Sequence, residues 1–325
     1  MKKSRKIILA VLGVLVVALG VITFFYQRDI SQARERVAGG SQIAQTACGA
    51  IEYAEQGNGL PLLVVHGAGG GYDQGLDIAA PLARAGYRVI AMSRFGYLRS
   101  PLPENASPAA QADAFACLLD ALHIQRVAVF GVSAGAPSSL QFALRHPQRT
   151  SALVLMVPGT YVPAENSGKQ EMRAPAGTMF LLETAMRFDF LFWAALKVAP
   201  DSMTRILLGT DPALVAGAGR EEQIRLSMVK EHILPVSPRG AGLLNEARVM
   251  SALEPYPLEQ ITVPVLTISA ADDLYNTYEA ARYTAGQIRG ARFVGYPSGG
   301  HLLVGHEPEA MAEITTFLKS AEHGK

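Results

Sequence analysis

The hydrophobic pattern begins with an apolar run that has no polar face. Four of the first six residues are basic, and an uncharged stretch follows from 7 to 26. About 20 such residues are enough to cross a bilayer as a helix, and the basic end is expected to stay in the cytoplasm. We therefore predict that residues 1–28 form an N-terminal transmembrane helix that anchors the chain in a membrane. The rest of the chain would then lie on the outer, periplasmic or extracytoplasmic side.

A cleaved signal peptide is the alternative interpretation of this run. It has the same basic start and apolar centre, but its apolar region is shorter and ends in small residues. Here the run ends in Phe24, Phe25 and Tyr26, which favours the uncleaved anchor. Cleavage would instead give a secreted protein. Polar residues follow from 29 to 44, and we interpret them as a short linker, or else as a juxtamembrane helix.

From about residue 45 onward, short apolar runs alternate with amphipathic stretches. The run at 62–65 contains only hydrophobic residues, which is typical of a strand buried on both faces. The apolar runs predict strands at 50–55, 62–65, 87–92, 126–130 and 152–157, and the stretches between them predict helices at 74–85, 107–122 and 134–146. This alternation predicts an α/β fold with a mostly parallel central sheet that is flanked by helices.

The alternation stops at residue 162 and resumes at 254. The interruption is helical and irregular, with helices expected at 178–198, 202–208, 220–233 and 240–252. After it, strands are expected at 263–269 and 291–296, and helices at 277–289 and 307–319. We therefore predict a core formed by residues 45–161 and 254–325, with a helical cap inserted at 162–253.

Composition narrows the range of functions. Lys+Arg 29 against Asp+Glu 28 leaves no basic surplus to neutralise phosphates, so we expect no nucleic-acid partner. The seven histidines are scattered, and the glycine-rich loop 66–71 lacks both common nucleotide-binding patterns, so we expect neither a metal nor a cofactor. Cys48 and Cys117 would pair only in an oxidising compartment. Because Cys117 lies on a helical pattern, we expect a buried free thiol in preference to a disulfide.

The main candidate for chemistry is Ser133, in the pentapeptide Gly131-Val132-Ser133-Ala134-Gly135 between a predicted strand and a predicted helix. A nucleophile on such a sharp turn needs glycine on both sides, since larger side chains would collide with nearby backbone. The pentapeptide alone is a weak signal because glycine and serine are common in turns. Its context therefore decides the interpretation.

Two later loops supply that context. Asp272 follows the strand expected at 263–269, and His301 follows the strand expected at 291–296. Both can reach the serine, because the carboxyl ends of parallel strands share one edge of the sheet. His301 would be the base that takes the serine proton, and Asp272 the carboxylate that holds the imidazole in one tautomer. Asp273 is the direct competitor, but its spacing from the strand end favours Asp272.

In this order of serine, aspartate and histidine, the chain resembles the α/β-hydrolase superfamily over residues 45–320. The other markers are Val64-Val65-His66-Gly67 and Gly299-Gly300-His301. The resemblance implies an oxyanion hole formed by the backbone N–H groups of Ala68 and Ala134. It also implies that His66 shapes the loop and is not a base.

A serine at the turn implies acyl transfer, whereas the dehalogenases and epoxide hydrolases of the superfamily carry aspartate there. Esterase, lactonase, thioesterase, C–C hydrolase and peptidase activities all stay open, and so does a sensor that binds a ligand without turnover. We expect a small hydrophobic substrate bound by Gly67, Phe180 and Trp193, because apolar residues crowd this part of the cap. Arg94 and Arg99 are expected to be solvated, although either would also suit a substrate carboxylate.

Overall fold

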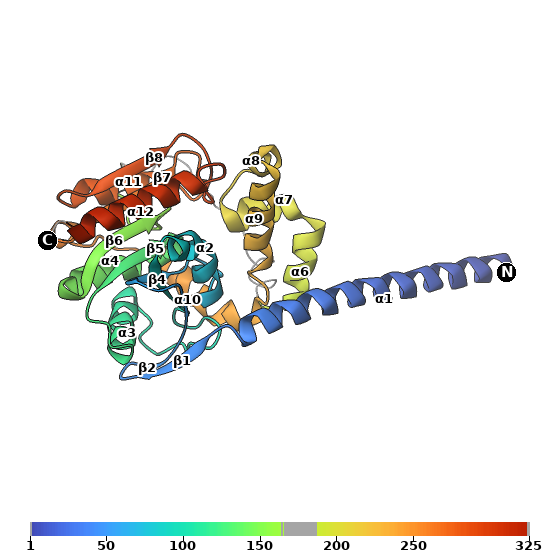
Figure 1. The fold of residues 1–325 in the computed structure, drawn as a ribbon. Helices are drawn as coiled ribbons and strands as arrows, with labels where there is room; N and C mark the ends of the chain where they lie inside the picture. The colour runs from blue at the N-terminus through green and yellow to red at the C-terminus, as the bar shows by residue number, and fades with distance from the viewer. Residues whose placement is uncertain (1, 164, 166–186, 324–325) are drawn as a thin grey trace.

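The computed structural model describes residues 2–163, 165 and 187–323 (Figure 1). Its centre is an eight-stranded sheet in the order β1-β2-β4-β3-β5-β6-β7-β8. The first two strands are antiparallel to their neighbours, and the other six run parallel, which confirms the predicted α/β sheet. The strands are β1 (Gln42–Thr46), β2 (Gly49–Gln56), β3 (Leu60–Val65), β4 (Tyr87–Met92), β5 (Val127–Val132), β6 (Thr150–Met156), β7 (Val265–Ala270) and β8 (Arg292–Tyr296).

Helices cover both faces of the sheet, because its central strands are apolar on both sides. In β3, Leu63 and Val65 belong to one hydrophobic cluster, and Leu62 and Val64 belong to the cluster on the opposite face. The first cluster is covered by α3 (Pro108–Ala121), α4 (Ala136–Arg145) and α11 (Thr277–Gln287), and the second by α2 (Tyr72–Arg84) and α12 (Glu307–His323). Successive side chains of the strand thus point to opposite faces of the sheet and both faces are buried, which explains why the predicted run at 62–65 is entirely hydrophobic.

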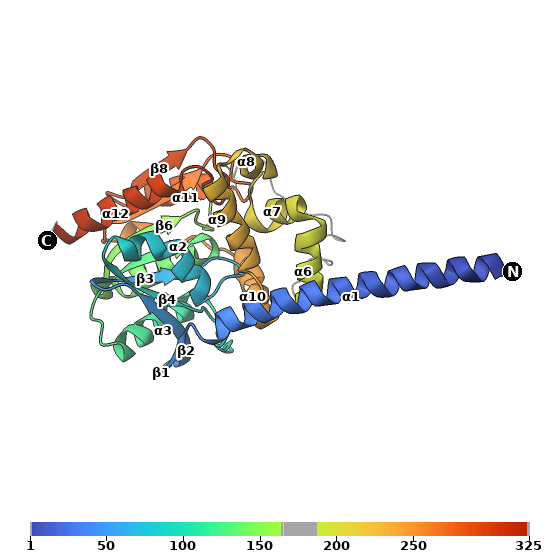
Figure 2. The same ribbon diagram turned by 45° about the vertical axis from the view of Figure 1, so that its right-hand side comes forward.

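Between β6 and β7 the described residues form a separate group of helices beside the sheet (Figures 1 and 2). They are α6 (Asp189–Val198), α7 (Pro200–Leu208), α8 (Pro212–Gly217), α9 (Arg220–Glu231) and α10 (Gly240–Ser251). They lie within residues 162–253, the segment for which a cap is expected, and we call them the cap helices. The first part of the helix expected at 178–198 lies outside the described residues, and α6 begins at Asp189.

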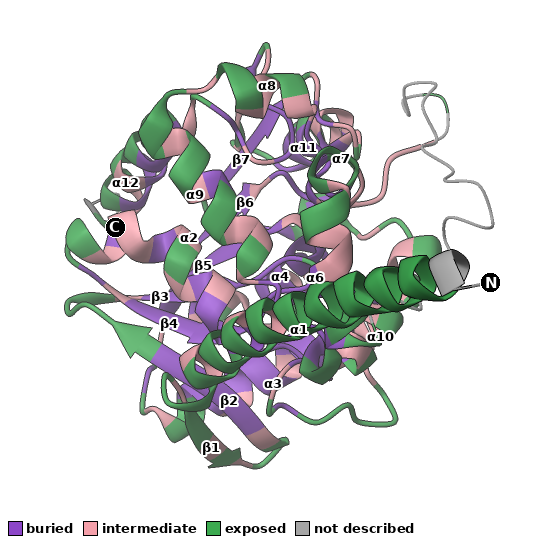
Figure 3. Cartoon of the chain, turned by 90° about the vertical axis from the view of Figure 1, so that its right-hand side faces the viewer, coloured by how far each residue is buried: buried purple, intermediate pink, exposed green. Residues whose placement is uncertain are grey.

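The N-terminal helix α1 (Lys2–Ala38) is longer than expected. Residues 5–25 of this helix are exposed along the part that projects from the domain (Figure 3). The helix is long and apolar enough to cross a membrane, and a signal sequence near an N-terminus meets the same criteria of length and composition. Ile30 and Ala33, three residues apart on one helical face, are buried in a cluster with residues of the cap. Of the two interpretations of the polar stretch 29–44, the linker is wrong for residues 29–38, which continue the helix and pack on the domain as a juxtamembrane helix.

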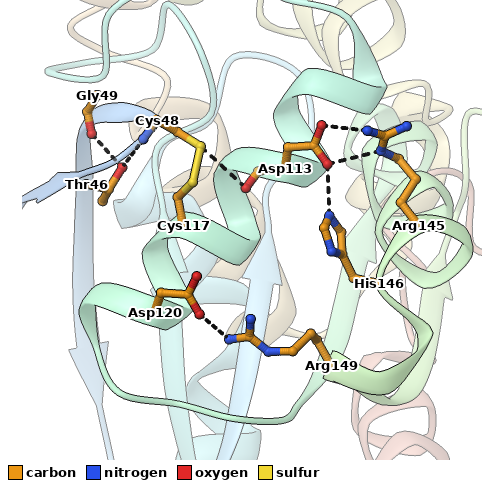
Figure 4. Close-up of a disulfide and its surroundings, with 9 residues drawn as sticks. All are labelled: Thr46, Cys48, Gly49, Asp113, Cys117, Asp120, Arg145, His146 and Arg149. Carbon is orange, nitrogen blue, oxygen red and sulfur yellow. Dashed lines mark hydrogen bonds and ion pairs between the residues drawn. A yellow bond between two sulfur atoms is a disulfide. The ribbon is translucent and has the colours of Figure 1, made fainter.

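A disulfide joins Cys48 to Cys117, so the expected free thiol is also wrong (Figure 4). The turn between β1 and β2 carries Cys48 over α3, and the two Cα atoms are 5.9 Å apart. Beside it, Asp113 of α3 accepts hydrogen bonds from Arg145 and His146 at the end of α4. The pairing depends on how this hairpin sits on α3, which local sequence patterns do not encode.

Candidate active site

Ser133 lies at the sharp turn where β5 ends and α4 is about to begin. It opens a short 3-10 helix, Ser133–Gly135, and has a φ of 50°. This left-handed conformation is uncommon for a residue with a side chain and is found at strained functional turns. Close packing explains the flanking glycine: a Cβ on Gly135 would lie 2.5 Å from the carbonyl oxygen of Val65. The predicted strand-to-helix turn with a serine at its tip is confirmed.

His301 connects Ser133 to a carboxylate. Its Nε2 lies 2.8 Å from Ser133 Oγ, and its Nδ1 lies 2.7 Å from Asp273 Oδ2. The imidazole and the carboxylate are both buried, whereas Ser133 is partly exposed. If Nδ1 donates its proton to the carboxylate, Nε2 is free to accept a proton from the serine.

The carboxylate that faces His301 is Asp273, so the assignment of Asp272 to this position is wrong. Oδ1 of Asp272 instead accepts a hydrogen bond from the N–H of Gly300, at 2.7 Å. The prediction counted from a strand ending at Ser269, but β7 continues through Ala270. One extra residue in the strand shifts the loop, and adjacent loop residues point in different directions.

Asp273 is held in place by its own loop and by the helix that follows. Its Oδ1 accepts the N–H of Tyr275 at 2.8 Å, and its Oδ2 accepts the hydroxyl of Thr277 at the start of α11. The ring of Tyr275 packs edge-on against His301, with centroids 4.8 Å apart. The carboxylate and the imidazole are therefore both held in position by the protein's own groups.

The glycine-rich loop after β3 approaches Ser133 at Gly67. A Cβ on Gly67 would lie 3.1 Å from the Cβ of Ser133. The Gly67 carbonyl accepts a hydrogen bond from a guanidinium nitrogen of Arg94 at 3.1 Å, and it lies 2.7 Å from His66 Nδ1. In a trans peptide the N–H points away from the carbonyl, so the N–H of Ala68 is directed away from these two side chains.

His66 is a neutral hydrogen-bonding group in this structure. Its Nε2 accepts the backbone N–H of Arg94 at 3.0 Å, so its own proton lies on Nδ1, which faces the Gly67 carbonyl. Burial, together with the nearby charge of Arg94, lowers the pKa of His66 well below its usual value. His66 is therefore unsuited to be a base and well suited to fix the loop.

Arg94 is buried, and the expectation that it is solvated or available to a substrate carboxylate is wrong. Its guanidinium donates to the carbonyls of Gly67 and Ala134 and forms an ion pair with Glu246 of the cap helix α10. The hydroxyl of Tyr97 donates to the same Glu246 carboxylate at 2.8 Å. The partner of Arg94 lies 152 residues away, and no local sequence signal indicates it.

Arg99 does not face the serine either. Its Nε donates to the buried carboxylate of Glu52 at 2.7 Å, and its guanidinium also donates to the carbonyl and the hydroxyl of Ser41. These contacts attach the loop after β4 to the antiparallel edge of the sheet. Arg99 is therefore a structural residue in this fold.

A cavity of about 290 Å³ opens beside Ser133 and His301. This size suits a small molecule, and Gly67 and Ala68 line the same cavity. Sequence reasoning missed most of its apolar wall, since helical spacing indicates a buried face but not what that face covers. These apolar residues are Ile78, Val132, Met156, Val157, Leu207, Leu208, Met228, Val229, Leu302, Leu303 and Met311.

The two cap residues expected to bind substrate are not found there. Trp193 packs against Tyr26 of α1 and donates its indole N–H to Asp29 at 2.9 Å, so its assignment to the substrate site is wrong. Phe180 lies outside the described residues. Among the residues that the structure describes, no group of three or more His, Cys, Asp or Glu side chains is placed to hold a metal ion.

Known proteins resemble this chain over most of its length. A family model for the alpha/beta hydrolase fold matches residues 61–308. The uncharacterized hydrolase YcgS of Bacillus subtilis (strain 168) is 27% identical over 282 residues, which cover 84% of this chain and 96% of that protein. A solved alpha/beta hydrolase fold protein from Nakamurella multipartita is 29% identical with a TM-score of 0.68, over 86% of this chain and 99% of that one.

A shorter part of the chain is similar to a 2-hydroxy-6-oxononadienedioate/2-hydroxy-6-oxononatrienedioate hydrolase of Paraburkholderia xenovorans (strain LB400). The two are 36% identical over 121 residues, which cover 35% of this chain and 42% of that protein. The family match is much longer, since it extends from β3 into α12 and includes the whole parallel part of the sheet. On this evidence the protein belongs to the α/β-hydrolase fold family of enzymes.

Proposed function

We propose that the protein is a serine hydrolase that cleaves an ester or a related carbonyl bond of a small, hydrophobic, uncharged substrate. The observation that carries this proposal is the continuous hydrogen-bonded series from Ser133 through His301 to Asp273, which borders an apolar cavity. A serine hydroxyl is a poor nucleophile near pH 7, and an adjacent imidazole provides the base that it requires.

In the proposed first step, Ser133 Oγ attacks the substrate carbonyl carbon while His301 Nε2 takes the serine proton. The imidazolium is stabilised by the carboxylate of Asp273, and it then protonates the leaving group. Water, activated by the same imidazole, hydrolyses the acyl-serine and restores the hydroxyl. The chain's own side chains supply every proton transfer.

The negative charge that develops on the carbonyl oxygen would be held by the N–H groups of Ala68 and Ala134. The support for Ala68 is the fixed peptide between it and Gly67, whose carbonyl is bound on the opposite side by His66 and Arg94. The donors on that carbonyl polarise the peptide, which makes its N–H a stronger donor. The support for Ala134 is its position directly after the nucleophile.

The charge of the cavity favours an uncharged substrate. Arg225 is the one arginine or lysine among its described lining residues, and its guanidinium already donates to Glu222 and to the carbonyl of Leu302. A dicarboxylate, as named for the Paraburkholderia xenovorans relative, would find no unpaired cation among these residues. We therefore propose esters of apolar acids or lactones over charged dienoates.

We further propose that α1 anchors the enzyme in a membrane with the hydrolase domain on the outer side. The basic first turn and the apolar run of α1 support this orientation. The disulfide between Cys48 and Cys117 supports it independently, because such bonds persist in oxidising compartments outside the cytoplasm.

A fluorophosphonate probe and a panel of p-nitrophenyl esters test the chemistry. The full-length protein should be labelled at Ser133 and should hydrolyse acetate and butyrate esters faster than a succinate monoester, whose acyl group is charged. Ser133→Ala should abolish both labelling and turnover. Retained turnover in this variant would exclude the proposed nucleophile, and labelling of the wild type without turnover of any ester or lactone would favour a ligand-binding sensor.

A further inference from the structure

An exposed hydrophobic stripe follows the cap helix α6. Phe188, Leu191 and Val198 are 57%, 43% and 85% exposed. The spacing of seven residues puts Leu191 and Val198 on one face of the helix, with the half-buried Ala195 between them, and Phe188 directly precedes the first residue of the helix. Contiguous apolar side chains of this size on a protein surface mark an interaction site. We call Phe188, Leu191 and Val198 the α6 stripe.

The helix that carries the stripe is fastened to α1 at the end of its apolar run. The ring of Tyr26, the last residue of that run, packs edge-on against Phe190 and Trp193, with centroids 5.1 and 5.6 Å apart. One turn further along α1, the carboxylate of Asp29 accepts the indole N–H of Trp193 and pairs with Lys197. The stripe is therefore held near the level where the anchor would leave the hydrocarbon core.

The direction of α6 also fits a membrane surface. Figures 1 and 2 both show α6 running across the direction of α1, on the side of the cap nearest to the N-terminus. If α1 crosses the bilayer along its normal, α6 lies roughly in the plane of the surface, as amphipathic interfacial helices do. The aromatic cluster of Tyr26, Phe190 and Trp193 then falls at the depth where aromatic side chains are enriched.

We infer that α6 docks on the lipid bilayer through the α6 stripe, beside the point where α1 emerges. The inference rests on the proposed membrane anchor. Its occupant is lipid because the helix that carries the stripe is fastened to the anchor, through the contacts of Tyr26 with Phe190 and Trp193. The opposite side of α6 is committed to the protein: Asp189 pairs with Arg34 and accepts hydrogen bonds from Ser237. Docking gives the cap a second attachment to the membrane besides α1.

The test uses the full-length chain in phosphatidylcholine vesicles with a polarity-sensitive NBD probe on a single introduced cysteine. Leu191→Cys and Val198→Cys place the probe on the stripe, and the two native cysteines are already paired. Leu60→Cys is the matched control, because Leu60 is an exposed leucine (52%) at the start of β3. Flotation of the vesicles measures anchoring separately.

We expect the probes at 191 and 198 to emit at shorter wavelength than the probe at 60, and to be quenched by nitroxide-labelled lipids. The probe at 60 should keep the emission wavelength of a probe in water and should not be quenched by the nitroxide-labelled lipids. Chains that float with the vesicles but show water-like, unquenched probes at 191 and 198 would overturn the docking inference and leave the anchor intact. Chains that do not float would overturn both proposals, and neither outcome bears on hydrolysis.

Discussion

Glu246 on cap helix α10 pairs with Arg94, and Arg94 in turn holds the carbonyl of Gly67. The cap is thereby connected by charge to the loop that faces Ser133. Both members of the pair are buried, so the contact is not weakened by solvent as a surface ion pair would be. The loop that is proposed to stabilise the transition state thus depends on a residue of the cap.

Arg94→Lys should lower kcat about tenfold and leave KM nearly unchanged. Lysine keeps the charge but lacks the planar group that reaches two carbonyls at once, so the peptide before Ala68 loses polarisation that matters mainly in the transition state. Steady-state kinetics on a p-nitrophenyl ester measures the effect. Arg99→Lys is the control, since Arg99 pairs with Glu52 away from the cavity, and an equal fall in kcat there would contradict the assignment.

The two adjacent aspartates should behave very differently. Asp273→Asn should lower kcat about 10⁴-fold, because an amide no longer holds the imidazole in the reactive tautomer. Asp272→Asn keeps an oxygen that accepts the N–H of Gly300 and should retain activity within about tenfold of the wild type. Rates of acyl-enzyme formation in the two variants provide the comparison. Greater loss in Asp272→Asn would restore the assignment made from sequence.

Asp73 should make stability depend on pH in acid. Burial alone would raise the pKa of Asp73, but Arg239 and Arg36 lower it from 3.8 to about 2. The unfolded chain then binds more protons, so this stabilisation is complete above pH about 4 and is lost as pH falls through about 2. Its size is about 2 kcal/mol.

Urea unfolding between pH 5 and pH 2 measures this contribution. Asp73→Asn should be less stable than the wild type at pH 5, and the difference should narrow as the pH falls. Asp120→Asn is the control, because Asp120 is exposed and its pairing with Arg149 is a surface contact. A difference between wild type and Asp73→Asn that stays constant with pH would contradict the depressed pKa.

Loss of the disulfide should destabilise the domain without changing its chemistry. Replacing Cys48 and Cys117 together by alanine releases a loop with a sequence separation of 69 and should lower the free energy of unfolding by about 2–4 kcal/mol. Activity at 25 °C should stay close to that of the wild type, because the bond lies on α3, away from the cavity. Reduction of the wild type with dithiothreitol should lower the free energy of unfolding by the same amount. An unchanged free energy of unfolding after both the double substitution and the reduction would argue against pairing of the two cysteines in solution.

The sequence alone determined the features that depend on local pattern. Apolar runs of four to seven residues that alternate with amphipathic stretches are sufficient to predict a parallel sheet, because a strand buried on both faces reads as an uninterrupted apolar run. Ser133 and His301 were recognised because each follows such a run, and chain topology brings strand ends to one edge. The apolar N-terminal run needs no tertiary information either, since its length alone matches a bilayer.

Tertiary structure decided what lies beyond the reach of local pattern. The choice between Asp272 and Asp273 depended on one additional residue in β7. The disulfide depended on how the β1–β2 hairpin sits on α3. The helical continuation of α1 depended on its packing against the cap helices. Arg94 gave no signal because its partners come from loops and from a helix far away in sequence. Such contacts depend on the distance between elements after folding, and local periodicity carries no information on that distance.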